Sequence, residues 1–209
     1  MKFKQLNITG FKSFSDKTTF LIEDGLTGIV GPNGCGKSNI VESLRWCMGE
    51  NSAKSMRGSG MEDVIFSGTS NRPSKNISEV SLMLDNQNKD GQVQYKEFDE
   101  VSVRRKIEKD KGSKYYINDK EVRARDVQTL FADMSTGAHS PSLISQGRIG
   151  QLVTSKPIER KSILEEAAGI SGIHARRQEA ETRLNAAENN LKRADELKKQ
   201  QQKQLDNLK

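Results

Sequence analysis

A glycine-rich loop at residues 31–39 constrains this chain more than any other feature of its sequence. The loop reads GPNGCGKSN and fits the pattern G-x-x-x-x-G-K-[ST], a loop that binds phosphate groups. The apolar run at residues 26–30 precedes it as a predicted strand, and residues 40–46 follow with helical spacing. Strand, glycine loop and helix is the order in which this motif folds. The segment therefore predicts a site for a nucleoside triphosphate.

Each residue type in the loop has a chemical reason. Gly34 and Gly36 allow the backbone to turn its N–H groups toward phosphates with no side chain in the way. The N-terminus of the following helix adds a partial positive charge that attracts an anion. Lys37 can reach the β- and γ-phosphates, and the Ser38 hydroxyl can bind Mg²⁺. We expect ATP to contact the whole loop, which is Gly31, Pro32, Asn33, Gly34, Cys35, Gly36, Lys37, Ser38 and Asn39.

Composition limits what the rest of the chain can be. Of its 209 residues, 33% are hydrophobic and 30% are charged, so we expect part of the chain to bury little core. The net charge of +6 permits contact with nucleic acid without requiring it. The densest basic cluster, at residues 104–106, is predicted to be a solvated strand face. The lack of a signal peptide, of a long apolar run and of metal-ligand cysteine spacing favours a cytoplasmic protein with no membrane contact.

We predict two parts, an α/β lobe at residues 1–160 and a helix entering a coiled coil at residues 161–209. With Leu184 at the first position of a heptad, six of the eight core positions are apolar, which is typical of a coiled coil. The alternative is a single amphipathic helix docked on its own lobe. Within the lobe we expect strands at residues 3–8, 18–22, 63–66, 79–84, 100–107 and 114–117, a mobile loop at 50–60, and a helix at 124–131.

A hydrolytic site of this kind also needs an acidic residue on a second strand to hold Mg²⁺. Asp85, which follows the apolar run at residues 81–84, is the available candidate. Its position before a polar turn is more typical of the end of a hairpin strand. We therefore interpret the chain as one half of a nucleotide site. The alternative is a self-contained kinase or transferase that uses Asp85 as its acid.

Several segments together resemble the N-terminal head of the structural maintenance of chromosomes (SMC) family, in particular its bacterial chromosome-condensation branch. The resemblance implies an ATP-binding-cassette fold, α/β with mixed sheets plus helices, followed by the start of a long antiparallel coiled coil. A second alternative is a coiled-coil DNA-repair ATPase of the RecN or RecF type, which should lack the EEAAGI letters that start at residue 165. The matching segments are residues 6–14, 31–39, 56–58, 61–66, 144–149 and 163–170.

The resemblance also implies roles for residues outside the loop. Gln146 matches a glutamine that contacts Mg²⁺ and senses the γ-phosphate, so the expected metal contacts are Ser38 and Gln146. Arg57 matches an arginine loop that contacts nucleotide in the engaged head and couples it to DNA. Lys12 and Ser13 match residues near the nucleotide. His139 lies where the sequence departs from the family pattern, and we interpret it as a structural loop residue. The expected catalytic set is Lys37, Gln146 and Arg57.

The resemblance also implies partners, because in this family two distant segments of one polypeptide form each head. The far C-terminus of the same polypeptide would supply the Walker B acid, the catalytic glutamate and the signature serine. A second SMC subunit would form a homodimer, so that ATP is held between two heads and hydrolysis releases them. Double-stranded DNA and kleisin-type accessory subunits complete the expected assembly. Its implied function is to organise, condense and partition chromosomal DNA.

Replacing Lys37 tests the nucleotide site directly. We expect Lys37→Ile to abolish ATP binding, because the variant loses the cation that reaches the β- and γ-phosphates. Titration of a fluorescent ATP analogue measures this, with Lys89→Ile in a predicted polar turn as the matched control. ATP binding retained by Lys37→Ile would reject the site.

Overall fold

The computed structural model describes residues 1–89, 92–134, 143, 150, 153–168 and 170–207. The chain divides into two compact units, Met1–Ser171 and Gly172–Lys209. The first unit contains all of the described strands and the shorter helices. The second unit consists almost entirely of one long helix, α5 (Ser171–Asn207).

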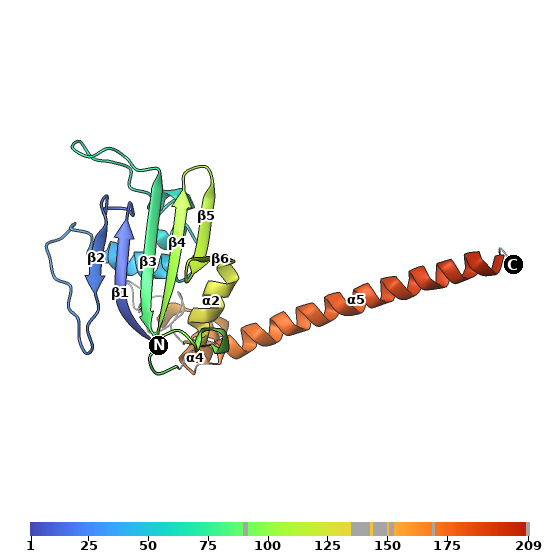
Figure 1. Cartoon of the computed structure of the whole chain (residues 1–209). Helices are drawn as coiled ribbons and strands as arrows, with labels where there is room; N and C mark the ends of the chain where they lie inside the picture. The colour runs from blue at the N-terminus through green and yellow to red at the C-terminus, as the bar shows by residue number, and fades with distance from the viewer. Residues whose placement is uncertain (90–91, 135–142, 144–149, 151–152, 169, 208–209) are drawn as a thin grey trace. The chain divides into compact units, whose positions relative to one another are not determined.

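A six-stranded sheet is the frame of the first unit (Figure 1). Its strand order is β2-β1-β3-β4-β5-β6, and every described pairing is antiparallel. The sequence predicts five of these strands to within three residues at either end. It misses β6, because three residues are too few to show alternation. The bounds are β1 Lys2–Thr9, β2 Thr18–Leu21, β3 Ile77–Asp85, β4 Glu100–Glu108, β5 Gly112–Ile117 and β6 Lys120–Val122.

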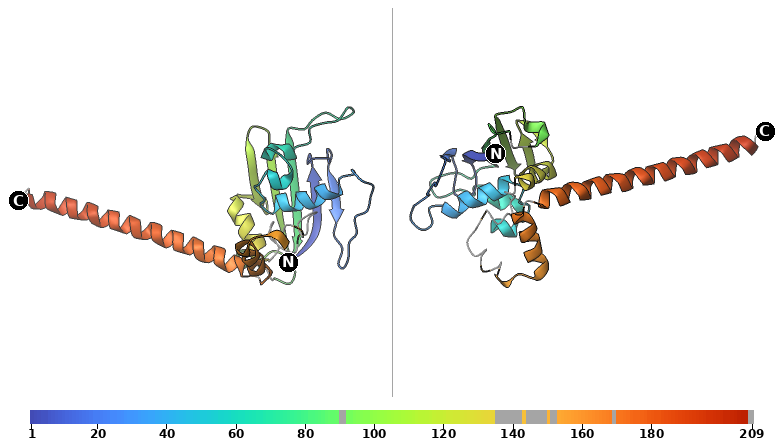
Figure 2. Two further views of the ribbon diagram at one scale, coloured as in Figure 1. Left: turned by 180° about the vertical axis from the view of Figure 1, so that it is seen from behind. Right: turned by 90° about the horizontal axis from the view of Figure 1, so that it is seen from below.

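Helices and short turns complete the first unit. Helix α1 (Lys37–Cys47) lies across one face of the sheet and contacts β3 and β4 (Figure 2). Helix α2 (Ala124–Asp133) contacts β5, and α4 spans Pro157–Ala167. The helices that the sequence predicts at residues 40–46 and 124–131 are therefore confirmed. Three 3-10 turns are η1 Lys54–Met56, η2 Met61–Val64 and η3 Val93–Tyr95.

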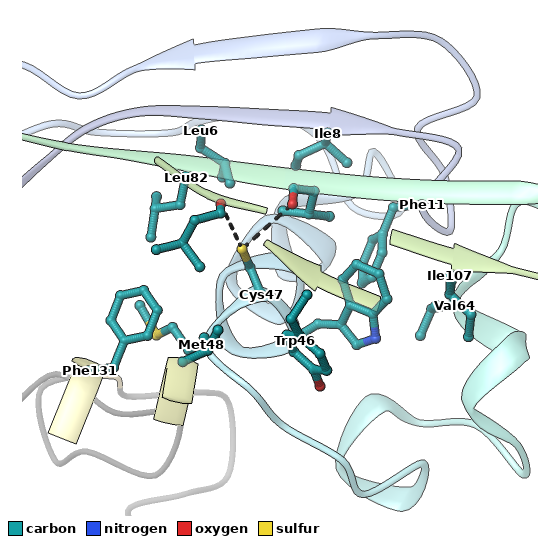
Figure 3. Packing of buried hydrophobic residues seen from close by; sticks show 14 of the residues in the cluster. Leu6, Ile8, Phe11, Trp46, Cys47, Met48, Val64, Leu82, Ile107 and Phe131 are labelled. Atoms are coloured by element: carbon teal, nitrogen blue, oxygen red, sulfur yellow. Dashed lines mark hydrogen bonds between the residues drawn. The ribbon is translucent and has the colours of Figure 1, made fainter. Parts of the chain in front are cut away.

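The core lies between α1 and the sheet (Figure 3). Trp46 and Cys47 at the end of α1 are both fully buried, and the Trp46 ring contacts that of Phe11 at a centroid distance of 5.5 Å. The Cys47 thiol lies 3.6 Å from the carbonyl oxygen of Val80 and 3.5 Å from that of Val103. Burial raises the pKa of the Cys47 thiol to about 12. The C-terminal end of α1 is thus embedded in the middle of the sheet.

Arg105 is buried, so the prediction of a solvated basic face at residues 104–106 is wrong for its central residue. The Arg105 guanidinium lies between the rings of Trp46 and Tyr115, 4.4 Å and 4.6 Å from their centroids. Its Nη1 donates to the carbonyl oxygens of Trp46 at 2.8 Å and Glu50 at 2.6 Å. Alternation along β4 turns residue 105 inward, and the carbonyls at the end of α1 make a cation acceptable there.

Residues 63–66 do not form the predicted strand. The turn η2 takes its first two residues, and Ile65 makes only an isolated bridge, to Phe11. The Asp63 carboxylate accepts hydrogen bonds from the N–H groups of Gly60 and Ser59 and from the Ser59 hydroxyl, which lowers the pKa of Asp63. A short acidic side chain that binds the backbone in this way favours a turn over a strand.

Residues 26–30 also lack the predicted strand. Leu26 and Val30 are almost fully exposed, and the segment has no regular structure. A strand needs a neighbour for its N–H and C=O groups, and no strand within the described residues pairs with this segment. Apolar content alone therefore misled the prediction.

The predicted loop at residues 50–60 contains the turn η1, so it is not wholly irregular. Glu50 at its start is buried and pairs with Arg45 at 2.9 Å, and Met56 is buried in the core. These contacts attach the segment at both places, so the structure does not bear out a mobile loop there.

The long helix α5 confirms the helical part of the coiled-coil prediction. Its heptad leucines Leu184, Leu191 and Leu205 are 63%, 67% and 49% exposed. An exposed leucine row at this spacing is the seam that a second helix covers in a coiled coil. Leu208, the last predicted core position, lies outside the described residues. Among the described helices, none has both the length and the apolar content to cross a bilayer.

Replacing Arg105 tests whether it ties α1 to the sheet. We expect Arg105→Ala to lower the free energy of unfolding by about 3 kcal/mol, because two buried carbonyls lose their donor. Arg104→Ala is the matched control. Arg104 lies next to it on β4 with partly exposed ion pairs, so its loss should cost less than about 1 kcal/mol. Equal urea midpoints for the two variants would contradict a role for Arg105 in attaching α1 to the sheet.

The two cysteines should differ sharply in reactivity. At pH 8 we expect a thiol reagent to modify the exposed Cys35 at once and the buried Cys47 only as the chain unfolds.

The pKa of Cys47 also predicts how stability depends on pH. The unfolded Cys47 ionises near its ordinary pKa of 9.0, whereas the folded one stays protonated to about 12. Stability should therefore fall as pH rises above 9, by about 1.4 kcal/mol per unit. Unfolding curves of Cys47→Ala provide the control, because its free energy of unfolding should not show this fall above pH 9.

Candidate nucleotide-binding site

The predicted glycine loop lines a pocket of about 460 Å³. Arg57, which lies on a different segment, lines the same pocket. The structure thus brings a residue from the 50–60 segment to the loop. The lining residues are Asn33, Gly34, Gly36, Lys37, Ser38, Asn39 and Arg57.

Two glycines shape the loop for close approach of a ligand. Gly34 and Gly36 have φ angles of 84° and 97°, which residues with side chains rarely adopt. A Cβ atom at Gly36 would lie 2.5 Å from the Ser13 hydroxyl oxygen, so a larger residue cannot fit there. The backbone of the loop can therefore form a concave surface of N–H groups.

The pocket also receives the N-terminus of α1. Gly36 is the N-cap, and no side chain accepts a hydrogen bond from the first turn, which holds no acidic residue. The free N–H groups and the helix dipole favour a negative group at this position. Ser38 lies in this first turn, where its hydroxyl is close to any bound anion.

Lys37 closes the loop on itself. Its Nζ donates to the carbonyl oxygens of Gly31 at 2.5 Å and Pro32 at 2.6 Å, and lies 3.8 Å from Cys35 Sγ. These contacts hold the ammonium group at the loop that lines the pocket. The glycine surface, the helix N-terminus and this ammonium together fit a phosphate chain, and the Ser38 hydroxyl is a suitable oxygen ligand for Mg²⁺.

A short chain of hydrogen bonds joins the other predicted residues. Asn39 Nδ2 donates to the Ser13 hydroxyl at 2.9 Å, and Arg57 Nη2 donates to Asn39 Oδ1 at 2.9 Å. Asn39 therefore links the start of the lobe to the arginine segment, at the wall of the pocket. The structure brings Ser13, Asn39 and Arg57 together, as their common assignment near a nucleotide requires.

Glu42 belongs to this site and was missed by sequence reasoning. Its carboxylate pairs with Arg57 Nε at 2.5 Å and with Lys12 Nζ, and its side chain is only 10% exposed. It lies four residues after Ser38 on α1, so the two share one helix face. An acid at that spacing on a predicted helix was the signal that could have identified it.

Other candidates lie elsewhere. Gln146 and His139 lie outside the described residues. Asp85 ends β3 opposite Lys2 and accepts a hydrogen bond from the Gln87 N–H. Glu79 pairs with Thr9, the last residue of β1, which lies three residues before Lys12. Asp85 lies six residues, or about 20 Å, from Glu79 along β3 and so at the other end of the strand. Asp85 is therefore a strand-end residue, as the sequence suggested, and no metal-binding cluster of acidic, histidine or cysteine side chains occurs among the described residues.

Comparison with known proteins gives a consistent result. The family model described as RecF/RecN/SMC N terminal domain matches residues 2–148. The chain is 55% identical over 197 residues to the Chromosome partition protein Smc of Cereibacter sphaeroides, covering 94% of this chain and 17% of that protein. It is 53% identical over 209 residues to the protein of the same name from Rhodopseudomonas palustris, covering all of this chain and 18% of that protein. The chain thus spans less than a fifth of these relatives.

Solved structures agree. An Smc head domain with an extended coiled coil from Pyrococcus furiosus, bound to the C-terminal domain of ScpA, matches with a TM-score of 0.75 and 30% identity over 94% of this chain and 49% of that one. A chain from work on ATP-driven dimerization and DNA-stimulated activation of SMC ATPases matches with a TM-score of 0.68 and 30% identity, over 80% of this chain and 99% of that one.

These matches favour the SMC branch over the RecN and RecF alternative, because the curated relatives and the solved heads carry the SMC name. They also confirm the expected fold of an SMC head lobe followed by a coiled-coil helix. With a family match across more than half of its length, this chain belongs to the SMC family.

Proposed function

We propose that this chain is the N-terminal, ATP-binding half of an SMC head. The full protein would use ATP-driven engagement of two heads, followed by hydrolysis, to organise, condense and partition chromosomal DNA. The observation that carries this proposal is that the glycine loop, the α1 N-terminus and Arg57 meet at the same pocket. The names of its relatives supply the biological setting.

The other half of the head would come from the C-terminal segment of the same polypeptide. The exposed apolar residues 26–30 support this, since Leu26 and Val30 offer a strand-like segment that no described strand pairs with. A strand from the C-terminal segment could cover these side chains and satisfy the backbone. That segment would also supply the acid for Mg²⁺ and the catalytic glutamate.

Within this half, each residue has a distinct task. Lys37 and the loop amides bind the phosphates, and Arg57 contacts nucleotide in the engaged head and couples it to DNA. Ser38 and Gln146 would hold Mg²⁺, which would supply positive charge to neutralise the phosphates. Lys12 and Ser13 support the pocket wall. The remaining contacts with ATP come from Gly31, Pro32, Asn33, Gly34, Cys35, Gly36 and Asn39.

The partners follow from the same assembly. A second SMC subunit supplies its signature motif to this nucleotide, and an antiparallel helix covers the exposed leucines of α5. We place the boundary between lobe and arm at residues 160 and 161. Kleisin-type subunits and double-stranded DNA complete the complex. One solved SMC head is bound to ScpA, which supports a subunit of that kind.

ATP turnover by the isolated chain and by a mixture tests the proposal. We expect the 209-residue chain to be inactive by itself and to hydrolyse ATP when mixed with the C-terminal segment of its own gene, because each alone holds half of the catalytic groups. A mixture that contains Lys37→Ile is the control and should stay inactive.

Two outcomes would contradict this. Robust hydrolysis by the isolated chain would mean that these 209 residues hold a complete site, and would reject the half-site. Inactivity of the wild-type mixture, despite association of the two parts, would reject completion of the site by that segment.

A further inference from the structure

Glu42 is a buried acid that the phosphate-loop motif does not explain. The residue as a whole is 7% exposed. It lies on α1, one helical turn after the first residues that line the pocket. An ionised carboxylate with so little solvent is costly unless cations pair with it. The cations that pair with Glu42 must therefore offset the cost of burying its charge.

Each oxygen of this carboxylate binds one cation from a different segment. Oε2 pairs with Lys12 Nζ, and Oε1 pairs with Arg57 Nε at 2.5 Å. Both partners have left-handed backbones, with φ angles of 48° for Lys12 and 54° for Arg57. Residues with side chains keep such angles only where surrounding contacts hold them. Glu42 is the contact that these two residues share.

The same carboxylate fixes the backbone before Arg57 through Lys12. Besides Glu42, Lys12 Nζ contacts the carbonyl oxygen of Met56 at 2.5 Å. Met56 is itself buried and directly precedes Arg57. Glu42 thus holds Arg57 twice, once at the guanidinium and once through the peptide that leads into it.

This arrangement leaves one edge of the guanidinium for a ligand. Nε is bound by Glu42 and Nη2 by Asn39, and within the described part of the chain Nη1 makes no hydrogen bond or ion pair. The Arg57 side chain is 58% exposed and lines the pocket. An exposed arginine otherwise samples many rotamers, so two fixed nitrogens define where the third can meet a phosphate oxygen.

We propose that Glu42 is the positioning residue for Arg57. It holds the guanidinium in the pose in which Arg57 meets the nucleotide, and the coupling of nucleotide to DNA by Arg57 depends on it. The inference rests on the proposed function of this site. It adds a role for an acid that acts through Arg57 and does not touch the substrate.

A first experiment measures the pose without nucleotide. In the 209-residue chain, solvent exchange of the Arg57 Nε–H is followed by nitrogen-15 NMR, with Arg57→Lys to assign the signal. We expect Glu42→Gln to speed this exchange about tenfold, because the charge-assisted hydrogen bond becomes a neutral one. Glu50→Gln is the matched control, since Glu50 is a buried acid paired with Arg45 just beyond the other end of α1. Unchanged exchange in Glu42→Gln would overturn the proposal.

A second experiment measures the consequence in the full-length protein. We expect Glu42→Gln to lower DNA-stimulated kcat about tenfold with KM for ATP within about twofold, as Arg57→Ala should, because both remove the same oriented cation. The double variant should be no slower than Arg57→Ala, since positioning has no effect once its target is gone. Additive losses would assign Glu42 a merely structural role.

The two experiments separate failure of this inference from failure of the proposed function. If Arg57→Ala leaves DNA stimulation intact, or the wild-type chain does not bind ATP, the proposed function is wrong. The exchange measurement would still decide whether Glu42 holds Arg57.

Discussion

The attachment of α1 to the sheet is the interaction on which the rest of the structure depends. Its last residues, Trp46 and Cys47, are buried against β3 and β4, and Arg105 binds the carbonyls where the helix ends. The opposite end of the same helix forms the floor of the pocket through Lys37 and Ser38. A helix fixed at one end by packing can present the other end with a defined position. The buried core therefore determines the geometry of the site.

Charge is arranged along this helix in a way that a motif search does not show. The first turn carries no acid, which keeps it favourable for an anion. One turn later Glu42 is nearly enclosed, and it recruits Lys12 and Arg57 from two other segments. The result is a pocket with a net excess of positive groups, of which Arg57 is both exposed and oriented. This combination suits phosphate recognition better than a cluster of unpaired lysines would.

Sequence patterns predicted the sheet well where alternation was long. Strands β3 and β4 alternate buried and less buried residues over nine positions each, so their period is unambiguous. The failures have separate physical causes. At residues 63–66 the carboxylate of Asp63 binds nearby N–H groups and favours a turn. At residues 26–30 the apolar pattern is real, but no described strand supplies hydrogen bonds. Local composition cannot reveal whether a partner is present.

The sequence by itself determined the phosphate loop, its flanking helix and the family, because these depend on residues close together in the chain or on their order. Only the tertiary structure decided that Asn39 joins Ser13 to Arg57 and that Glu42 joins Lys12 to Arg57. It also decided that Arg105 lies inside and not on the surface. Contacts between residues 15 to 59 positions apart depend on how elements pack, and no periodic pattern in one segment records that packing.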